Sequence, residues 1–231
     1  MRCVVSAVCL IWLLGCAPEG PSAFVTFNVA PEGDCTYSND LDNMFFPIGS
    51  YDLSTGDAGN CERPYVVNLL ANSFLRPNSD SDLGRAEPNV LQIHSAKVKL
   101  MSISRETLTF PDTDPALPNP FLVATNNALF PASGMTPSTG IAAVEVIPVA
   151  YAEQLTSLEG QQILADIQVL GTTTGDVDVE FKPFVYPIEL CDGCLVRCAS
   201  IFGDAKKEDV YGEDCADDAG ADGRICVDRG C

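Results

Sequence analysis

The stretch that decides the fold is Ile163-Leu-Ala-Asp-Ile-Gln-Val169, followed shortly afterwards by Val177-Asp-Val-Glu-Phe181. In each of these two segments, apolar residues occupy every second position, and the residues between them are mostly polar. Side chains alternate between the two faces of a β-strand, so this period predicts two strands, each with one dry and one solvated face. The intervening Gly171-Thr-Thr-Thr-Gly175-Asp176 supplies turn-forming residues. We therefore expect an antiparallel β-hairpin.

The same alternation occurs in two segments nearer the N-terminus. Over Phe24–Val29 the odd-numbered residues are apolar, and the same holds over Tyr65–Ala71. We expect both segments to be half-buried strands whose odd-numbered side chains face the core. These side chains are Val25, Phe27 and Val29 in the first segment, and Tyr65, Val67, Leu69 and Ala71 in the second.

Three more segments favour strands on different grounds. Phe121–Thr125 and Ile141–Val149 are short apolar runs, and the second is nearly all apolar, which is typical of a strand in the centre of a sheet. Pro183 and Pro187 flank Phe184–Tyr186. Because proline cannot donate a hydrogen bond to a neighbouring strand, we expect this segment to be a kinked or edge strand.

Val90–Ile103 is also expected to be a strand, but its alternation changes phase. Apolar residues fall at Leu91 and Ile93 before Ser95-Ala96, and at even-numbered positions after it. A one-residue slip moves every later side chain to the opposite face unless an extra residue is accommodated, so we expect a bulge or bend near Ser95-Ala96. His94 falls opposite the early apolar positions and is predicted to lie at the surface.

Together these segments predict an all-β domain over residues 23–190, an antiparallel β-sandwich of immunoglobulin-like architecture. A small barrel is the alternative. The Cys…Trp…Cys spacing of immunoglobulin domains is absent, since the one tryptophan is Trp12, near the N-terminus. The predicted helix is short, over Ala150–Leu158, with Tyr151, Leu155 and Leu158 on one face.

The segment 191–231 has a different composition from the rest of the chain. It contains six cysteines and few large apolar residues, so it cannot build a core of its own and would depend on cross-links. We expect a Cys-rich tail that is cross-linked by its own disulfides and packs at one end of the β domain. Six cysteines allow 15 pairings, and the sequence does not choose among them.

The N-terminus carries an export signal. Arg2 is followed by a short apolar run that ends at Leu13-Leu14-Gly15-Cys16, and the run is shorter than the roughly 20 residues of a membrane-spanning helix. These last four residues resemble the lipobox of bacterial lipoproteins, in which a signal peptide, here residues 1–15, is removed and the cysteine is lipidated. An ordinary secretory signal is the alternative. Residues 16–22 would then be a lipidated tether.

The resemblance implies a location as well as an anchor. Ala17 follows the cysteine where some Gram-negative lipoproteins carry an aspartate that retains them at the inner membrane. The expected location is therefore the cell envelope, at the outer membrane, and the sequence does not decide between its periplasmic and outer faces. Two or more acyl chains would hold the protein stably, since a single chain binds a membrane only marginally.

The cysteine count agrees with export. Of 11 cysteines, Cys3 and Cys9 would leave with the signal, and Cys16 would carry lipid. An even set remains, which in an oxidising compartment predicts disulfides: Cys35, Cys61, Cys191, Cys194, Cys198, Cys215, Cys226 and Cys231. A Cys35–Cys61 bridge would contribute on the order of 3 kcal/mol in the chain-entropy model.

The charge of the chain excludes one class of partner. There are 13 basic and 32 acidic side chains, a formal net charge of −19. Such a polyanion is repelled by nucleic acid phosphates, so we expect no nucleic acid partner. The acidity favours solubility and self-repulsion at a crowded surface; affinity for divalent cations is the alternative.

Two local motifs in the tail invite a chemical interpretation. Cys191-Asp-Gly-Cys194 has the C-x2-C spacing of zinc sites and redox pairs, but in an oxidising compartment we expect structural disulfides. Asp218, Asp222 and Gly223 match positions one, five and six of a calcium loop. Gly220 and Arg229 fail the positions for two further ligands, so Asp218 and Asp222 are weak candidates and a solvated acidic loop is expected.

No catalytic residues are predicted, and no cofactor. His94 is the one histidine, and the G-x-S-x-G and H-E-x-x-H motifs are absent. The chain as a whole resembles uncharacterised exported lipoproteins with a β-rich body and a Cys-rich tail. We expect a non-catalytic binding or assembly module, attached to the membrane through its lipid and contacting another envelope protein or a glycan. The alternatives are an envelope enzyme acting on polysaccharide or peptidoglycan through paired carboxylates, and a calcium-dependent adhesin.

Overall fold

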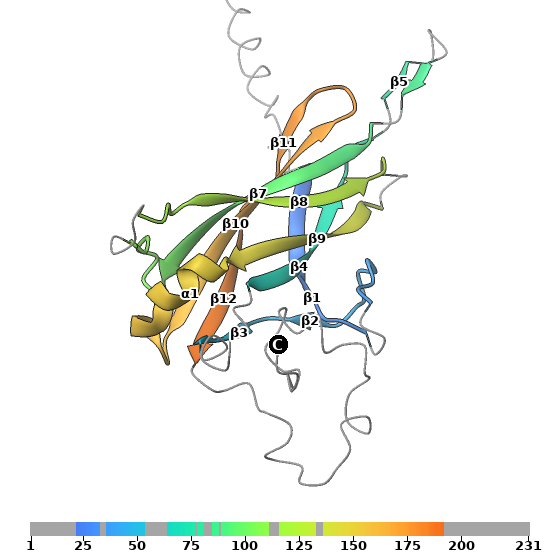
Figure 1. Cartoon of the computed structure of the whole chain (residues 1–231). Helices are drawn as coiled ribbons and strands as arrows, with labels where there is room; N and C mark the ends of the chain where they lie inside the picture. The colour runs from blue at the N-terminus through green and yellow to red at the C-terminus, as the bar shows by residue number, and fades with distance from the viewer. Residues whose placement is uncertain are drawn as a thin grey trace, which may run out of the picture.

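The computed structural model describes residues 22–32, 36–53, 64–76, 78–80, 85–87, 89–110, 116–132 and 136–191 (Figure 1). This part of the chain consists mostly of β-strands, and its strand pairs are antiparallel apart from β3–β12. The all-β class predicted from the sequence is confirmed. In chain order the elements are β1 (Ala23–Val29), β2 (Phe45–Phe46), β3 (Gly49–Asp52), β4 (Tyr65–Ser73), β5 (Asn78–Asp80), β6 (Arg85–Glu87), β7 (Leu91–Ser102), β8 (Phe121–Leu129), β9 (Ser138–Ile147), α1 (Val149–Leu155), β10 (Gln162–Thr173), β11 (Asp178–Glu180) and β12 (Phe184–Cys191).

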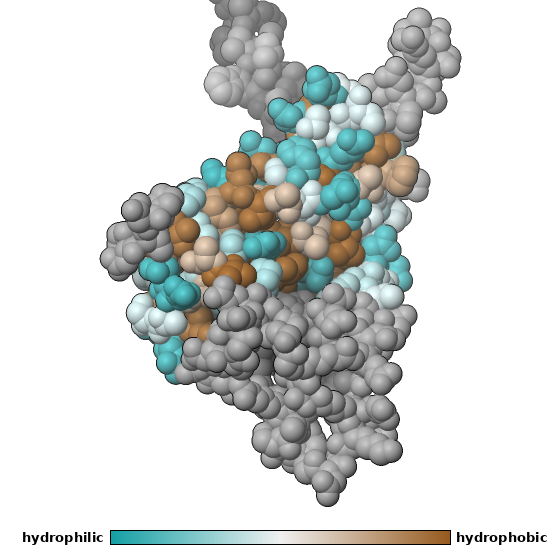
Figure 2. All heavy atoms as spheres, viewed as in Figure 1, coloured by the Kyte–Doolittle hydropathy of each residue, from teal (hydrophilic) through white to brown (hydrophobic). Residues whose placement is uncertain are grey.

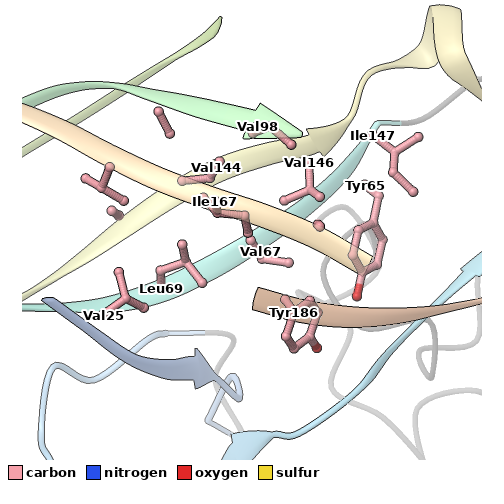
Figure 3. Packing of buried hydrophobic residues seen from close by; sticks show 14 of the residues in the cluster. Val25, Tyr65, Val67, Leu69, Val98, Val144, Val146, Ile147, Ile167 and Tyr186 are labelled. Carbon is pink, nitrogen blue, oxygen red and sulfur yellow. The ribbon is translucent and has the colours of Figure 1, made fainter. Parts of the chain in front are cut away.

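Two sheets share one core. The first has the strand order β2-β1-β4-β9, and the second has β3-β12-β10-β7-β8 with β11 paired to β10. A single cluster of buried apolar side chains draws on both sheets. Figure 3 shows Val67 and Leu69 of β4 in this cluster with Val98 of β7 and Ile167 of β10. The short β5–β6 hairpin forms a separate two-stranded sheet.

The hairpin predicted from the opening stretch is confirmed as β10 and β11. Alternate residues of β10 from Ile163 to Thr173 are buried, and Ile163, Ala165, Ile167 and Val169 are at most 1% exposed. The turn is shorter than predicted, because β10 continues to Thr173 and Gly171 lies inside it. Gly171 pairs with Ile93 of β7 rather than forming the turn.

The phase slip in β7 is confirmed as a bulge. The pairing of β7 with β8 shifts between Ile93 and Ser95, and the pairing with β10 shifts at the same level, between Leu170 and Gly171. Apolar side chains face the core on both sides of the slip, at Leu91 and Ile93 and again from Ala96 onward. The extra residue therefore keeps the whole strand in phase with the core.

The prediction for β1 is wrong at Phe27, while Val25 and Val29 are buried as expected. Val25 pairs with Ala71 and Asn28 pairs with Leu69, so three steps along β1 match two steps along β4. This bulge turns Asn28, which is fully buried, toward the core, and leaves Phe27 half-buried on the outer face. The predicted alternation in β4 holds, with Tyr65, Val67, Leu69 and Ala71 all in the core cluster.

The predicted central position of Ile141–Val149 is wrong. In the described sheet β9 pairs with β4 alone and lies at the edge. The apolar run misled the sequence interpretation because its last residues leave the strand, and Val149 begins α1. The free side of β9 is partly covered by β8, where the Asn127 side chain donates a hydrogen bond to the Ile141 carbonyl oxygen.

The predicted edge position holds for Phe184–Tyr186, which pair with β10 alone in the described sheet, but not for the rest of β12. β12 pairs with β10 on one side and with β3 on the other. The β3 pairing begins at Ile188, one residue after Pro187, so the proline, which lacks an N–H, precedes that ladder. The predicted helix is confirmed as α1 and a 3-10 turn over Thr156–Leu158, with Tyr151 and Leu155 buried.

Candidate functional site

Most of the predicted site residues lie outside the described part of the chain. These are the lipidation residue Cys16, the weak metal candidates Asp218 and Asp222, and all of the predicted disulfide cysteines except Cys191. The lipid anchor and the disulfide framework therefore stay predictions. Within the described residues, no helix is long and apolar enough to span a membrane.

Cys191 is the predicted disulfide residue that can be placed. It ends β12, pairs with Asp52 of β3, and its Sγ atom lies 3.5 Å from the Tyr51 carbonyl oxygen. It is disulfide-bonded, and the partner cysteine falls outside the described residues.

His94 is exposed, as predicted, and it belongs to a polar network across three strands. Its Nδ1 lies 2.9 Å from the Ser95 Oγ, and its Nε2 lies 3.4 Å from the Thr172 Oγ1. The Thr172 hydroxyl donates to the Asp178 carboxylate at 3.2 Å. In a regular strand His94 and Ser95 would point to opposite faces, so it is the β7 bulge that brings their side chains together. Sequence reasoning found the bulge but not this consequence of it.

The direction of one bond in this network is defined. Thr172 donates to Asp178, so its hydroxyl oxygen can accept from the His94 Nε2 in the tautomer that carries a proton there. The remaining ring nitrogen, Nδ1, can accept from the Ser95 hydroxyl. His94 and Asp178 are both exposed, so water competes for every one of these bonds.

The described acidic groups form no obvious reaction centre. Asp52 is the buried carboxyl group in this part of the chain, and Asp166 is paired with Lys99 at 2.9 Å. No cluster of three or more His, Cys, Asp or Glu residues within the described ranges is arranged to hold a metal ion. Burial raises the pKa of Tyr151 above its usual value, and its hydroxyl donates to the Pro118 carbonyl, which makes it a structural residue.

Exposed apolar side chains gather at two opposite ends of the body. We define the far end as Leu41, Met44 and Phe45, which are 46%, 74% and 55% exposed and lie in and before β2. The Phe45 ring packs on Phe27 of β1 with 5.2 Å between ring centroids. The bulge in β1 is what places Phe27 on this outer face, so the sequence alternation could not reveal the contact.

The far end is anchored to the first sheet by backbone hydrogen bonds. β2 pairs with the last residues of β1, and the Ala30 N–H donates to the Met44 carbonyl at 2.9 Å. The preceding loop reaches across the outer side of the sheet, because the Asn39 side chain donates to the Thr139 carbonyl of β9 at 3.3 Å. The backbone of Met44 and Phe45 is therefore held by β1.

We define the tether end as Phe24, Phe74, Phe130 and Val177. Phe74, Phe130 and Val177 are 42%, 70% and 60% exposed, and Phe24 stacks on Phe74 with 5.9 Å between ring centroids. The view in Figure 2 shows brown apolar residues beside teal polar residues on one face of the body, so exposed apolar residues also occur between the two ends. Leu122 on β8, 67% exposed, is one of them.

Comparison with known protein families and with curated proteins found no match for this chain.

Proposed function

We propose that this chain is an outer-membrane lipoprotein of the cell envelope whose β body acts as a non-catalytic binding or assembly module. The lipobox Leu13-Leu14-Gly15-Cys16 and the even set of remaining cysteines support the anchor and the compartment. The two sheets around a common core support an immunoglobulin-like sandwich as the rigid body of the module.

The far end is the observation that carries the binding function. Leu41, Met44 and Phe45 expose large apolar side chains within five residues of the chain, and the backbone of Met44 and Phe45 is hydrogen-bonded to β1. Aromatic residues and methionine are enriched at protein interfaces, whereas acidic residues and lysine are depleted there. A group of this kind at one end of a strongly acidic chain fits a protein partner better than a polyanionic or a highly polar one. We propose that the partner is another envelope protein.

Site-specific photocrosslinking in the intact envelope tests this function. With a photoreactive amino acid in place of Met44, we expect a discrete protein adduct that mass spectrometry can identify. The same amino acid at Leu122, which is similarly exposed on the other sheet, is the control and should give no such adduct. Adding Phe45→Ser should remove the adduct, because Phe45 is the aromatic side chain beside Met44. Equal adducts at both positions, or an adduct indifferent to Phe45→Ser, would refute the proposal.

Membrane fractionation tests the anchor separately. The variant Cys16→Ser cannot carry a thioether-linked lipid, so we expect the protein to leave the outer-membrane fraction and appear in the soluble fraction. Intact-mass analysis of the wild-type protein should show that residues 1–15 are absent and acyl chains present. A variant that still sediments with the outer membrane would contradict the lipid anchor.

A further inference from the structure

The start of β1 is surrounded by exposed apolar side chains that the proposed function does not use. The Phe74 N–H donates to the Ser22 carbonyl at 2.8 Å, so Phe74 lies directly beside the point where the described chain begins. The Ala132 N–H donates to the Leu75 carbonyl at 2.9 Å, which places the segment after β8, with Phe130, next to the segment after β4. Phe24, Phe74 and Phe130 thus belong to one end of the body.

The β10–β11 turn lies at the same end. The Thr174 N–H donates to the Val90 carbonyl at 2.9 Å, just before β7, and Leu91 of β7 pairs with Leu129, next to Phe130. The Lys182 N–H donates to the Ala23 carbonyl at 3.2 Å, which ties the chain after β11 to the start of β1. In Figure 1 the β10–β11 hairpin and the first residues of β1 lie at the top of the molecule. Val177, in the turn, therefore joins the tether end.

Covalent geometry limits how far this end can lie from the lipid. The chain from Cys16 to Ser22 spans at most about 20 Å when fully extended. Met44 and Phe45 of the far end, by contrast, lie beside the last residues of β1, roughly 20 Å further along a seven-residue strand. A lipid on Cys16 would therefore bring the tether end, and not the far end, to the membrane.

The chemistry of the tether end fits the interfacial layer of a bilayer. Interfacial amphipathic helices bury their apolar faces, which carry Trp, Phe and Leu, about 5–10 Å into the boundary between headgroups and acyl chains, and the tether end exposes side chains of the same kind. Asp176 and Asp178 flank Val177, while Lys182 lies nearby, so charge gives no strong attraction to anionic headgroups. Because the anchor keeps these side chains at high effective concentration next to the bilayer, even weak insertion would be populated.

We infer that the tether end, formed by Phe24, Phe74, Phe130 and Val177, inserts into the interfacial layer of the membrane that holds the acyl chains of Cys16. This contact orients the body and points the far end, with Leu41, Met44 and Phe45, away from the membrane toward its partner. The inference rests on the proposed lipid anchor, and it adds a second, non-covalent contact to it.

Tryptophan fluorescence of the lipidated protein tests the contact. Removal of residues 1–15 takes away Trp12, the one tryptophan of the chain, so a single introduced tryptophan reports one position without background. Phe74→Trp and Phe130→Trp place the probe at the tether end, while Phe45→Trp and Leu122→Trp are controls at positions that are also exposed. Each protein is reconstituted into phosphatidylcholine vesicles, with and without bromine atoms on the acyl chains.

We expect the emission of Phe74→Trp and Phe130→Trp to shift to shorter wavelength in vesicles and to be lost where the lipid is brominated. The emission of Phe45→Trp and Leu122→Trp should stay unquenched. Equal quenching at all four positions, or none at Phe74→Trp and Phe130→Trp, would overturn the inference. A blue shift that grows with protein concentration and is indifferent to bromine would assign the surface to a second copy of the chain, and would overturn it as well.

The outcomes separate this inference from the proposed anchor. If the anchor itself fails, the wild-type protein retains Trp12 and its fluorescence, or does not float with the vesicles. If the anchor holds but the tether end stays in water, the protein floats with the vesicles and the introduced tryptophans are not quenched. A further variant, Phe74→Ser with Phe130→Ser, should still float but lose the fixed orientation, measured as increased accessibility of the tether to protease.

Discussion

At the residue scale, the least expected side chain is Asn28. It is fully buried, donates from Nδ2 to the Tyr186 hydroxyl at 2.9 Å, and accepts at Oδ1 from the Asn68 N–H at 2.9 Å. The bulge in β1 leaves a register shift against β4, and the Asn28 side chain bonds the Asn68 N–H at this level. A buried donor without a partner is costly, so this asparagine stabilises the sheet by satisfying the backbone and crossing to β12.

Replacing Asn28 should therefore weaken the fold. For Asn28→Ala we expect the free energy of unfolding to fall by about 1–3 kcal/mol, because the Asn68 N–H is left buried and unsatisfied. Urea denaturation of the mature chain measures this change. Asn39→Ala removes one exposed side-chain hydrogen bond of 3.3 Å and should change the stability by less than about 0.5 kcal/mol. Similar losses in the two variants would show that Asn28 has no special role.

At the element scale, the bulge in β7 is the feature that the sequence predicted best. The phase of the apolar residues revealed it because core-facing positions must stay apolar on both sides of an inserted residue. The course of the neighbouring strand, β10, was predicted less accurately. Gly171 was predicted to begin a turn, but it continues β10 at the level of the bulge, where the two backbones approach closely.

Adding a methyl group at Gly171 tests this close approach of the β7 and β10 backbones. A Cβ atom there would lie 2.7 Å from the Gln92 carbonyl oxygen and 3.0 Å from the Leu91 Cδ1. We expect Gly171→Ala to lower the free energy of unfolding by about 1–3 kcal/mol through overpacking. The matched control is Gly175→Ala, whose added Cβ would lie 3.7 Å from its nearest neighbour, the Thr173 Oγ1, an ordinary van der Waals distance.

Thermal or urea unfolding of both glycine variants measures the difference between the two sites. Gly175→Ala should remain within about 0.5 kcal/mol of the parent. A loss at Gly175 as large as that at Gly171 would mean that glycine is needed for the hairpin turn, and that the close approach of β7 and β10 is not the cause.

At the scale of the whole molecule, the two sheets are held by a shared core and are also joined at their edges. Phe24 of β1 forms a bridge with Lys182, and β8 contacts β9 through Asn127. The core cluster includes side chains from β1, β4 and β9 of one sheet and from β7, β10 and β12 of the other. The stability of the body therefore comes chiefly from apolar burial across the sheets.

Reduction of the disulfides should leave this body folded. Of the predicted bridges, only Cys35–Cys61 lies wholly within residues 23–190, and it would contribute on the order of 3 kcal/mol in the chain-entropy model, whereas domains of ordinary size are stable by about 5–15 kcal/mol. With dithiothreitol we expect a lower melting temperature but a preserved β circular dichroism signal and a single cooperative transition. The control is the oxidised protein under the same conditions. Loss of the β signal on reduction would show that the cross-links, and not the core, hold the sheets together.

The sequence alone predicted the strands β1, β4 and β7 to β12, but not the short strands β2, β3, β5 and β6. For β4, β7 and β10 it also predicted which side chains face the core, because alternation is a local property of the backbone. It also predicted export and a lipid anchor, which depend on short contiguous motifs. Only the tertiary structure decided the order of the strands, the edge position of β9, the burial of Asn28 and the gathering of exposed apolar side chains at two opposite ends. These features arise from pairings between residues far apart in the chain, and no local period records which strand lies beside which.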